Sequence, residues 1–153
     1  MMEGKNYQRY RIMLKNREIA SIEMRGHKVK SFTQPDTKNK LPKLYVVKSG
    51  SEVIYVGLTS QSIKTRLRYG LQAQGEKGYY GYKWKDLSEV DILIWCFPQE
   101  SMERIEAVEA ELVYFLRQHT GKWPKYQMEI HFHHNISKDE IKVAEAIFKE
   151  SCG

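Results

Sequence analysis

The sequence predicts an α+β fold in which helices flank a small antiparallel sheet of three strands. Two short β-branched runs, 44–48 and 53–57, are separated by a glycine-containing turn, which predicts a hairpin. A nearly continuous apolar run at 90–97 predicts a third, central strand. Apolar residues recur at helical spacing in 100–118 and 137–150. This order of elements favours α+β, and 153 residues with 41% hydrophobic content suffice for one core.

The hairpin carries two tyrosines whose orientation depends on the turn. Side chains alternate along a strand, so Tyr45 and Tyr55 share a face only if the loop has an odd number of residues, such as Ser49-Gly50-Ser51. Thr59 and Ser60 can cap the helix that follows. We therefore expect a strand, a turn, a strand and a helix in close succession.

The second half of the chain has equally clear boundaries. Pro98 ends the predicted central strand, and Gly121 ends the long helix after it. The segment 127–132 is compatible with an edge strand. Ser137 and Glu140 fit a capping box that opens the last helix. Between the first helix and the central strand, 72–86 is a loop rich in glycine and aromatic residues.

The chain divides into three parts by composition. Residues 43–130 form the predicted core, and 131–153 form a C-terminal helical segment packed on it. Residues 1–42 are a basic N-terminal extension, with loop composition from Gly26 to Pro42. The extension is too short to bury a core of its own, so it must pack on the core, on a nucleic acid or on a second subunit. A homodimer is therefore left open.

Charge is segregated along the chain. Residues 1–85 contain 18 Lys and Arg against 6 Asp and Glu, whereas 86–153 contain 7 against 13. A basic face favours a polyphosphate partner, since binding releases counterions; the alternative is that the two halves neutralise each other. Cys96 and Cys152 have no Cys-x-x-Cys partner, which favours reduced thiols. With no apolar membrane-length run and no signal-peptide core, we expect a soluble protein of the prokaryotic or phage cytoplasm.

Four elements in order give the chain a specific resemblance. Tyr45 lies in a first strand, Tyr55-Val56-Gly57 follows about ten residues later, Arg66 lies on the next helix, and Glu109-Ala110-Glu111-Leu112-Val113 lies on a later helix. The region from about 43 to 127 resembles the GIY-YIG nuclease family. The resemblance implies a DNA endonuclease that uses a single Mg²⁺ or Mn²⁺ ion. The compact layout, with a basic extension, is similar to the restriction endonuclease branch.

The resemblance also implies roles for individual residues. Glu109 would hold the metal, at the border of the apolar stripe of its helix; without the motif, a solvated flank would be the ordinary interpretation. Arg66 would clamp phosphate oxygens. Tyr45 is favoured as the base and Tyr55 as the group that positions water or phosphate, although ordinary strand aromatics are the alternative. Gly57 would let the chain approach the substrate closely.

Two positions depart from the family pattern. Gly70 stands where many members have a histidine one turn after the arginine, so its role would be absent or supplied by Tyr82, Lys83 or Lys85. Gln127 stands near the place of a family asparagine, a similar amide one methylene longer. Neither change removes an indispensable group.

Basic and aromatic residues around the motif predict the interface with double-stranded DNA. We expect phosphate or base-edge contacts from the first helix, the glycine-rich loop and the extension. The residues expected at this interface are Lys64, Arg68, Tyr82, Lys83, Lys85, Arg9 and Arg11.

Other functions remain open from the sequence. The alternatives are a structure-specific or repair-type nuclease, a nucleic-acid-binding module with weak activity, and a toxin-like ribonuclease. His131 and His133 would share one face of a strand, but no spaced second pair accompanies them, so surface or DNA-contacting histidines are favoured over a zinc site.

Overall fold

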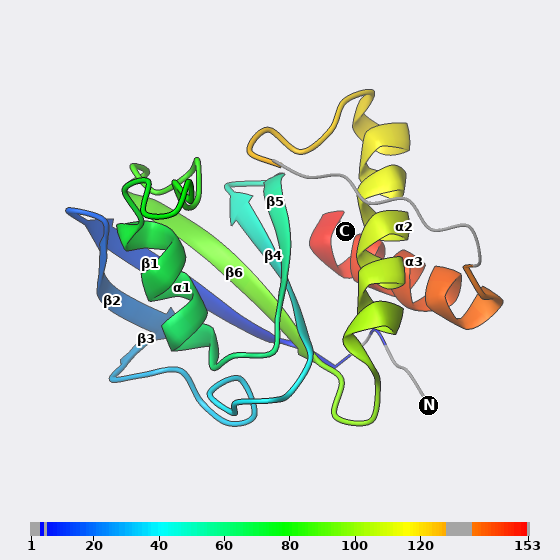
Figure 1. The fold of residues 1–153 in the computed structure, drawn as a ribbon, viewed down its shortest axis with the longest axis horizontal. Coiled ribbons are helices and arrows are strands. Elements are labelled where there is room, and N and C mark those ends of the chain that lie inside the picture. The colour runs from blue at the N-terminus through cyan, green and yellow to red at the C-terminus, as the bar shows by residue number, and fades with distance from the viewer. Residues whose placement is uncertain (1–3, 5, 128–135, 153) are drawn as a thin grey trace.

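The fold is an antiparallel six-stranded sheet with three helices, seen in a computed structural model (Figure 1). The structure describes residues 4, 6–127 and 136–152. The sheet order is β3-β2-β1-β6-β4-β5. In chain order the elements are β1 (Gln8–Lys15), β2 (Glu18–Met24), β3 (His27–Val29), β4 (Lys43–Ser49), β5 (Glu52–Thr59), α1 (Ile63–Gln72), β6 (Glu89–Cys96), α2 (Met102–Thr120) and α3 (Lys138–Cys152).

The α+β class and antiparallel pairing are confirmed, but the prediction of three strands was wrong. The three expected strands are β4, β5 and β6, with β6 central between β1 and β4. The other three come from residues 8–29, where β1 pairs with β6 along its length. Of the partners considered for the N-terminal extension, it packs on the core, as a continuation of the same sheet.

Two tight turns make this extension a sheet. Asn16 and Arg17 join β1 to β2 with φ of 54° and 62°, and Arg25 and Gly26 join β2 to β3 with φ of 53° and 79°. Two successive positive φ values are typical of the turns whose twist matches antiparallel strands. The backbone therefore doubles back twice within 22 residues of sequence.

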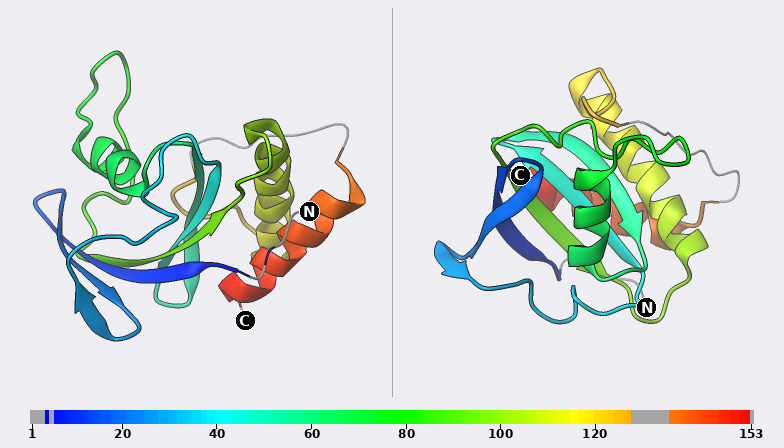
Figure 2. Two further views of the ribbon diagram at one scale, coloured as in Figure 1. Left: turned by 90° about the horizontal axis from the view of Figure 1, so that it is seen from below. Right: turned by 60° about the vertical axis from the view of Figure 1, so that its left-hand side comes forward.

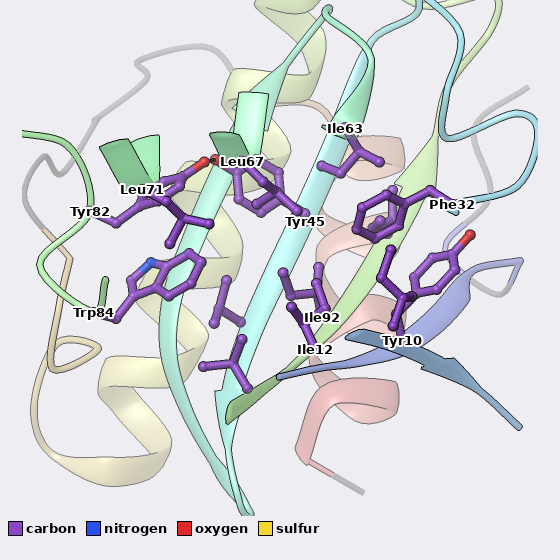
Figure 3. Packing of buried hydrophobic residues seen from close by; sticks show 14 of the residues in the cluster. Tyr10, Ile12, Phe32, Tyr45, Ile63, Leu67, Leu71, Tyr82, Trp84 and Ile92 are labelled. Atoms are coloured by element: carbon purple, nitrogen blue, oxygen red, sulfur yellow. Dashed lines mark hydrogen bonds between the residues drawn. The ribbon is translucent and has the colours of Figure 1, made fainter. Parts of the chain in front are cut away.

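Two hydrophobic layers lie on opposite faces of the sheet (Figure 2). On one face, α1 packs against alternate residues of the strands, with Tyr10, Ile12, Tyr45 and Ile92 among the buried side chains (Figure 3). On the other face, α2 and α3 pack against β4, β5 and β6. The two layers share the strands but not the side chains, because neighbouring residues of a strand point to opposite faces.

Helix ends agree in part with the sequence analysis. Gly121 ends α2 in the left-handed conformation at φ 81°, and the Ser137 Oγ accepts a hydrogen bond from the Glu140 amide at 3.3 Å, as expected. Ser62, not Thr59 or Ser60, is the N-cap of α1. Thr59 belongs to β5 and uses its hydroxyl to accept from the Gln61 amide at 3.0 Å. The expected edge strand at 127–132 and the histidines near 131 lie largely outside the described residues.

Candidate active site

Tyr45 and Tyr55 lie on the same face of the sheet, because of an irregularity in the hairpin. The turn has two residues, Gly50 and Ser51, between the paired Ser49 and Glu52, which alone would put the tyrosines on opposite faces. The register shifts between Val47 and Lys48, so that Val47 pairs with Tyr55. The odd-numbered loop predicted from the sequence is wrong, and a β-bulge supplies the extra residue instead.

Gly57 makes room for the Tyr45 hydroxyl. It pairs with Tyr45 across the hairpin, and a Cβ at this position would lie 2.5 Å from the Tyr45 hydroxyl oxygen. The same Cβ would lie 2.8 Å from the ring of Tyr55. Both contacts are too short for any side chain. The glycine of the Tyr-x-Gly motif is therefore needed for packing of the two tyrosines.

Tyr82 fills the space beside Gly70. A Cβ on Gly70 would lie 2.1 Å from the Tyr82 ring, and the Tyr82 amide donates to the Gly70 carbonyl at 2.9 Å. The Tyr82 and Tyr45 hydroxyls are 2.7 Å apart and point toward each other (Figure 3). Tyr82 is buried, so the structure places it in the core and not at the expected DNA surface. Of the three residues considered as a substitute for the missing histidine, Tyr82 is the one beside Tyr45.

Arg66 reaches the same tyrosine cluster from α1. Its guanidinium lies 4.8 Å from the centre of the Tyr82 ring, and its Nη1 donates to the Tyr79 hydroxyl at 2.9 Å. Burial lowers the pKa of Arg66, but the oxygens of Tyr45 and Tyr82 outweigh this effect, so the net pKa is raised. Arg66 is permanently charged and its guanidinium is fixed by Tyr79 and Tyr82, which suits the binding of an anionic ligand. The sequence predicts Tyr79 only as part of the loop that contacts DNA, because a tyrosine in a glycine-rich loop gives no sign of a partner such as Arg66.

The tyrosines of the cluster stay neutral phenols at neutral pH. Burial is the main cause that raises the pKa of Tyr45, Tyr55 and Tyr82 above the ordinary 10.0, and Arg66 opposes it in all three. Tyr45 has no exposed surface, whereas Tyr55 is half-buried. Of the two tyrosines that the motif supplies, Tyr55 is therefore the more accessible side chain.

Glu109 lies on α2, which packs on the face of the sheet opposite α1. It is 5% exposed on α2, next to Val108 in the apolar layer, and its charge raises the pKa of Tyr55. Within the described residues β5 lies at an edge of the sheet, so groups from both faces can meet around it. A carboxylate is the kind of oxygen donor that Mg²⁺ accepts. No cluster of three or more His, Cys, Asp or Glu occurs in the described part of the chain.

Gln127 closes the edge of β5. Its side-chain amide accepts from the Val56 amide at 2.9 Å and donates to the Val56 carbonyl at 3.0 Å, as a neighbouring strand would. Tyr126 adds a backbone hydrogen bond to the Ile54 carbonyl at 2.8 Å. The amide thus supports the strand between the two motif residues Tyr55 and Gly57.

The residues expected to contact DNA are not gathered in one place. Arg9 and Arg11 lie on the face opposite Tyr10 and Ile12, and both bind the Asp91 carboxylate, at 2.8 and 3.1 Å. Lys64 and Arg68 are exposed on α1 and line a cavity of about 200 Å³ together with Arg17.

The two expected lysines of the glycine-rich loop differ. Lys83 is exposed. Lys85 is half-buried, and its ammonium donates to the carbonyls of Tyr80 and Ala73 at 2.6 and 3.1 Å. Lys85 therefore secures the loop, whereas Lys83 is available to a ligand.

Comparison of the chain with protein-family models, with curated proteins and with solved structures gives no match. No helix in the described residues combines the length and apolar character needed to span a membrane. The functional argument therefore depends on the geometry of the site.

Proposed function

We propose that the protein is a divalent-metal-dependent endonuclease of double-stranded DNA, with a catalytic centre of the GIY-YIG type and a restriction-type role. The observation that carries the proposal is the arrangement of Tyr45, Tyr55, Arg66 and Glu109. They come from β4, β5, α1 and α2, and Tyr55 responds electrostatically to the other three. Tyr45 and Glu109 are buried and Arg66 and Tyr55 are half-buried, and a domain of this size does not need to withdraw these polar and charged groups from water in order to fold.

Each residue has a defined task in this proposal. Hydrolysis requires a water to attack phosphorus, a group to take its proton, and charge to be offset on the phosphate. Arg66 binds the phosphate oxygens, with Tyr79 and Tyr82 fixing the guanidinium. Glu109 would hold Mg²⁺ or Mn²⁺, and the bound ion would supply Lewis-acid stabilisation of the phosphate charge.

The two tyrosines are better assigned in the reverse of the sequence-based preference. The Tyr45 hydroxyl is buried against Tyr82, so it orients the cluster and does not meet water. Tyr55 is half-buried and lies in the electrostatic range of both Arg66 and Glu109. We therefore assign contact with the attacking water to Tyr55. Its raised pKa means that it serves as a base only when a nearby cation lowers that pKa.

The experiment that tests the proposal is incubation of the purified protein with plasmid, linear DNA, branched DNA and RNA, with Mg²⁺ or with a chelator. Discrete fragments of linear DNA that require Mg²⁺ are the expected result. Cuts confined to branches would favour the structure-specific alternative, and RNA cleavage would favour a ribonuclease. No cleavage of any substrate would leave a binding module.

A further inference from the structure

A second feature lies beside Arg66 and presents aromatic rings to which the chemistry described above gives no contact with DNA. It comprises Tyr69 on α1 and Tyr79 and Tyr80 on the following loop, and is called the tyrosine platform below. In Figure 2 (left) this loop projects away from the sheet beside α1. Tyr69 is 58% exposed and Tyr80 is 65% exposed, and they are two of the four large apolar side chains that remain exposed in the described residues.

Contacts within the chain hold the stacked part of the platform in place. The Tyr69 and Tyr79 rings stack with centroids 4.9 Å apart and an angle of 11° between their planes. The loop is closed by hydrogen bonds from the Gly75 amide to the Tyr79 carbonyl at 2.8 Å and from the Tyr79 amide to the Glu76 carbonyl at 3.0 Å. Since one face of Tyr69 is covered by Tyr79, its high exposure means that the other face is open to solvent. An immobilised aromatic face costs little entropy when a ligand binds.

The sequence around the platform is positively charged, which favours an anionic ligand. Residues 63–85 contain six Lys and Arg and one acidic residue, Glu76. The hydroxyl of Tyr79 accepts from Arg66, so the stacked pair directly adjoins the guanidinium assigned to the scissile phosphate. Exposed aromatic rings interleaved with cations are the usual means of holding nucleobases while the backbone is neutralised.

We propose that the tyrosine platform stacks an unpaired nucleobase of the DNA strand, next to the phosphate held by Arg66. The base lies in a single-stranded segment or is displaced from the duplex, because a paired base exposes no face to a ring. This inference rests on the proposed nuclease function and adds to it a contact with an unpaired or displaced nucleotide beside the cleavage position. Tyr69 supplies the open face of the stacked pair, and Tyr80 is the further exposed ring.

The test compares binding of three labelled DNA duplexes by fluorescence anisotropy, without added metal so that no cleavage occurs. One duplex is fully paired, one has a single unpaired thymine, and one has an abasic residue at that position. Tyr69→Ala should weaken binding of the duplex with the unpaired base on the order of tenfold, which is typical of one stacking contact. It should change binding of the paired and abasic duplexes less than about twofold, since neither offers a free base face.

Two matched variants sharpen the test. Tyr114→Ala removes a tyrosine that is 48% exposed on α2, away from the platform, and should leave all three affinities unchanged. Tyr69→Trp keeps an aromatic face and should retain the preference for the unpaired base. An equal loss on all three duplexes, or no loss on any, would overturn the proposal.

Failure of this inference and failure of the nuclease proposal give different results. If Tyr69→Ala has no effect on binding but cleavage depends on Arg66, the nuclease stands and the platform does not. If Tyr69 affects the unpaired base while no DNA is ever cleaved, the platform stands and the nuclease does not.

Discussion

The residues of the site have two kinds of role: some are needed for packing, and others are assigned to the proposed reaction. Gly57 and Gly70 are required because aromatic rings occupy the space where their side chains would be. Tyr45 and Tyr82 are buried and their hydroxyls are hydrogen-bonded to each other, so their role is to support the packing of the site. Tyr55, Arg66 and Glu109 remain as the groups to which the proposed chemistry is assigned.

Substitution of each tyrosine by phenylalanine separates these roles, because it removes the hydroxyl and keeps the ring. We expect Tyr55→Phe to lower the cleavage rate on the order of 10²-fold or more, the usual scale for a lost proton-transfer group. Tyr45→Phe should lower the rate less, because its hydroxyl acts through Tyr82. Single-turnover cleavage of a DNA duplex measures both. A dead Tyr45→Phe enzyme with an active Tyr55→Phe enzyme would restore the assignment first favoured from the sequence.

The contact between Gly70 and Tyr82 predicts a loss of stability on Gly70→Ala. In a helix interior this change normally stabilises by about 1 kcal/mol. Here the new methyl group would overlap a buried ring, so we expect the free energy of unfolding to fall by about 1–3 kcal/mol. Denaturant unfolding measures it. The double variant with Tyr82→Leu should recover most of the loss, and additive losses would show that the two positions are not coupled.

The elements explain why the site forms around β5. The bulge in the hairpin turns Tyr55 to the face of Tyr45, α1 brings Arg66 over that face, and α2 carries Glu109 on the opposite face, where its charge raises the pKa of Tyr55. Gln127 then forms hydrogen bonds with both backbone groups on the outer side of Val56. Each element places one motif residue, so the site depends on the packing of all of them.

The buried tyrosines predict how the elements respond to alkaline pH. Burial raises the pKa of Tyr45, Tyr55 and Tyr82, and raises that of Tyr10 to about 12. The folded state holds these protons more tightly than the unfolded state, so the stability they contribute is complete below pH of about 10 and is lost as the pH rises above it. In an alkaline titration followed by tyrosinate absorbance, the buried tyrosines should ionise at higher pH than the exposed ones. Their ionisation should coincide with loss of the circular dichroism signal of the fold. Ionisation of all tyrosines in one step while the fold persists would contradict this.

The N-terminal strands are structural, which predicts the result of deleting residues 1–42. β1 covers one side of β6 and contributes Tyr10 and Ile12 to the core, so the truncated chain would expose a strand edge and apolar surface. We expect it to be insoluble or aggregated in size-exclusion chromatography. Arg9→Gln with Arg11→Gln, which removes charge but no strand, should stay folded. A folded, monomeric truncation would mean that the three strands are dispensable.

Most of the helices and strands could be predicted from the sequence, but the N-terminal strands could not. The hairpin, α1, β6, α2 and α3 were found because their apolar periodicity is strong and their ends carry proline, glycine or a capping box. The first hairpin was missed because Asn16-Arg17 lacks the glycine that normally marks such a turn, although Tyr10 and Ile12 alternate with Arg9 and Arg11. The bulge and the place of Tyr82 depend on contacts between distant segments, which no local pattern reveals.

The whole molecule separates its basic residues into different regions. Arg9 and Arg11 are bound to Asp91 on one face, while Arg66 and the tyrosine platform lie on the other, beside α1. A single straight duplex at Arg66 would therefore not be read by Arg9 and Arg11 as the sequence suggested. The basic surface nearest the proposed chemistry is that of residues 63–85.

The central claim is that Arg66 and Glu109 belong to one metal-dependent phosphodiesterase site, although they lie on helices on opposite faces of the sheet. The most direct measurement is the rate of plasmid cleavage in Mg²⁺ by Arg66→Ala and Glu109→Gln, each beside a matched control on the same helix. Arg68→Ala and Glu111→Gln are those controls, and thermal melting checks that all four variants are folded. We predict that cleavage by the first pair falls by several orders of magnitude, on the scale of lost transition-state stabilisation, and that the controls stay close to the wild type. Full activity of folded Arg66→Ala or Glu109→Gln, or equal losses in the controls, would contradict the account.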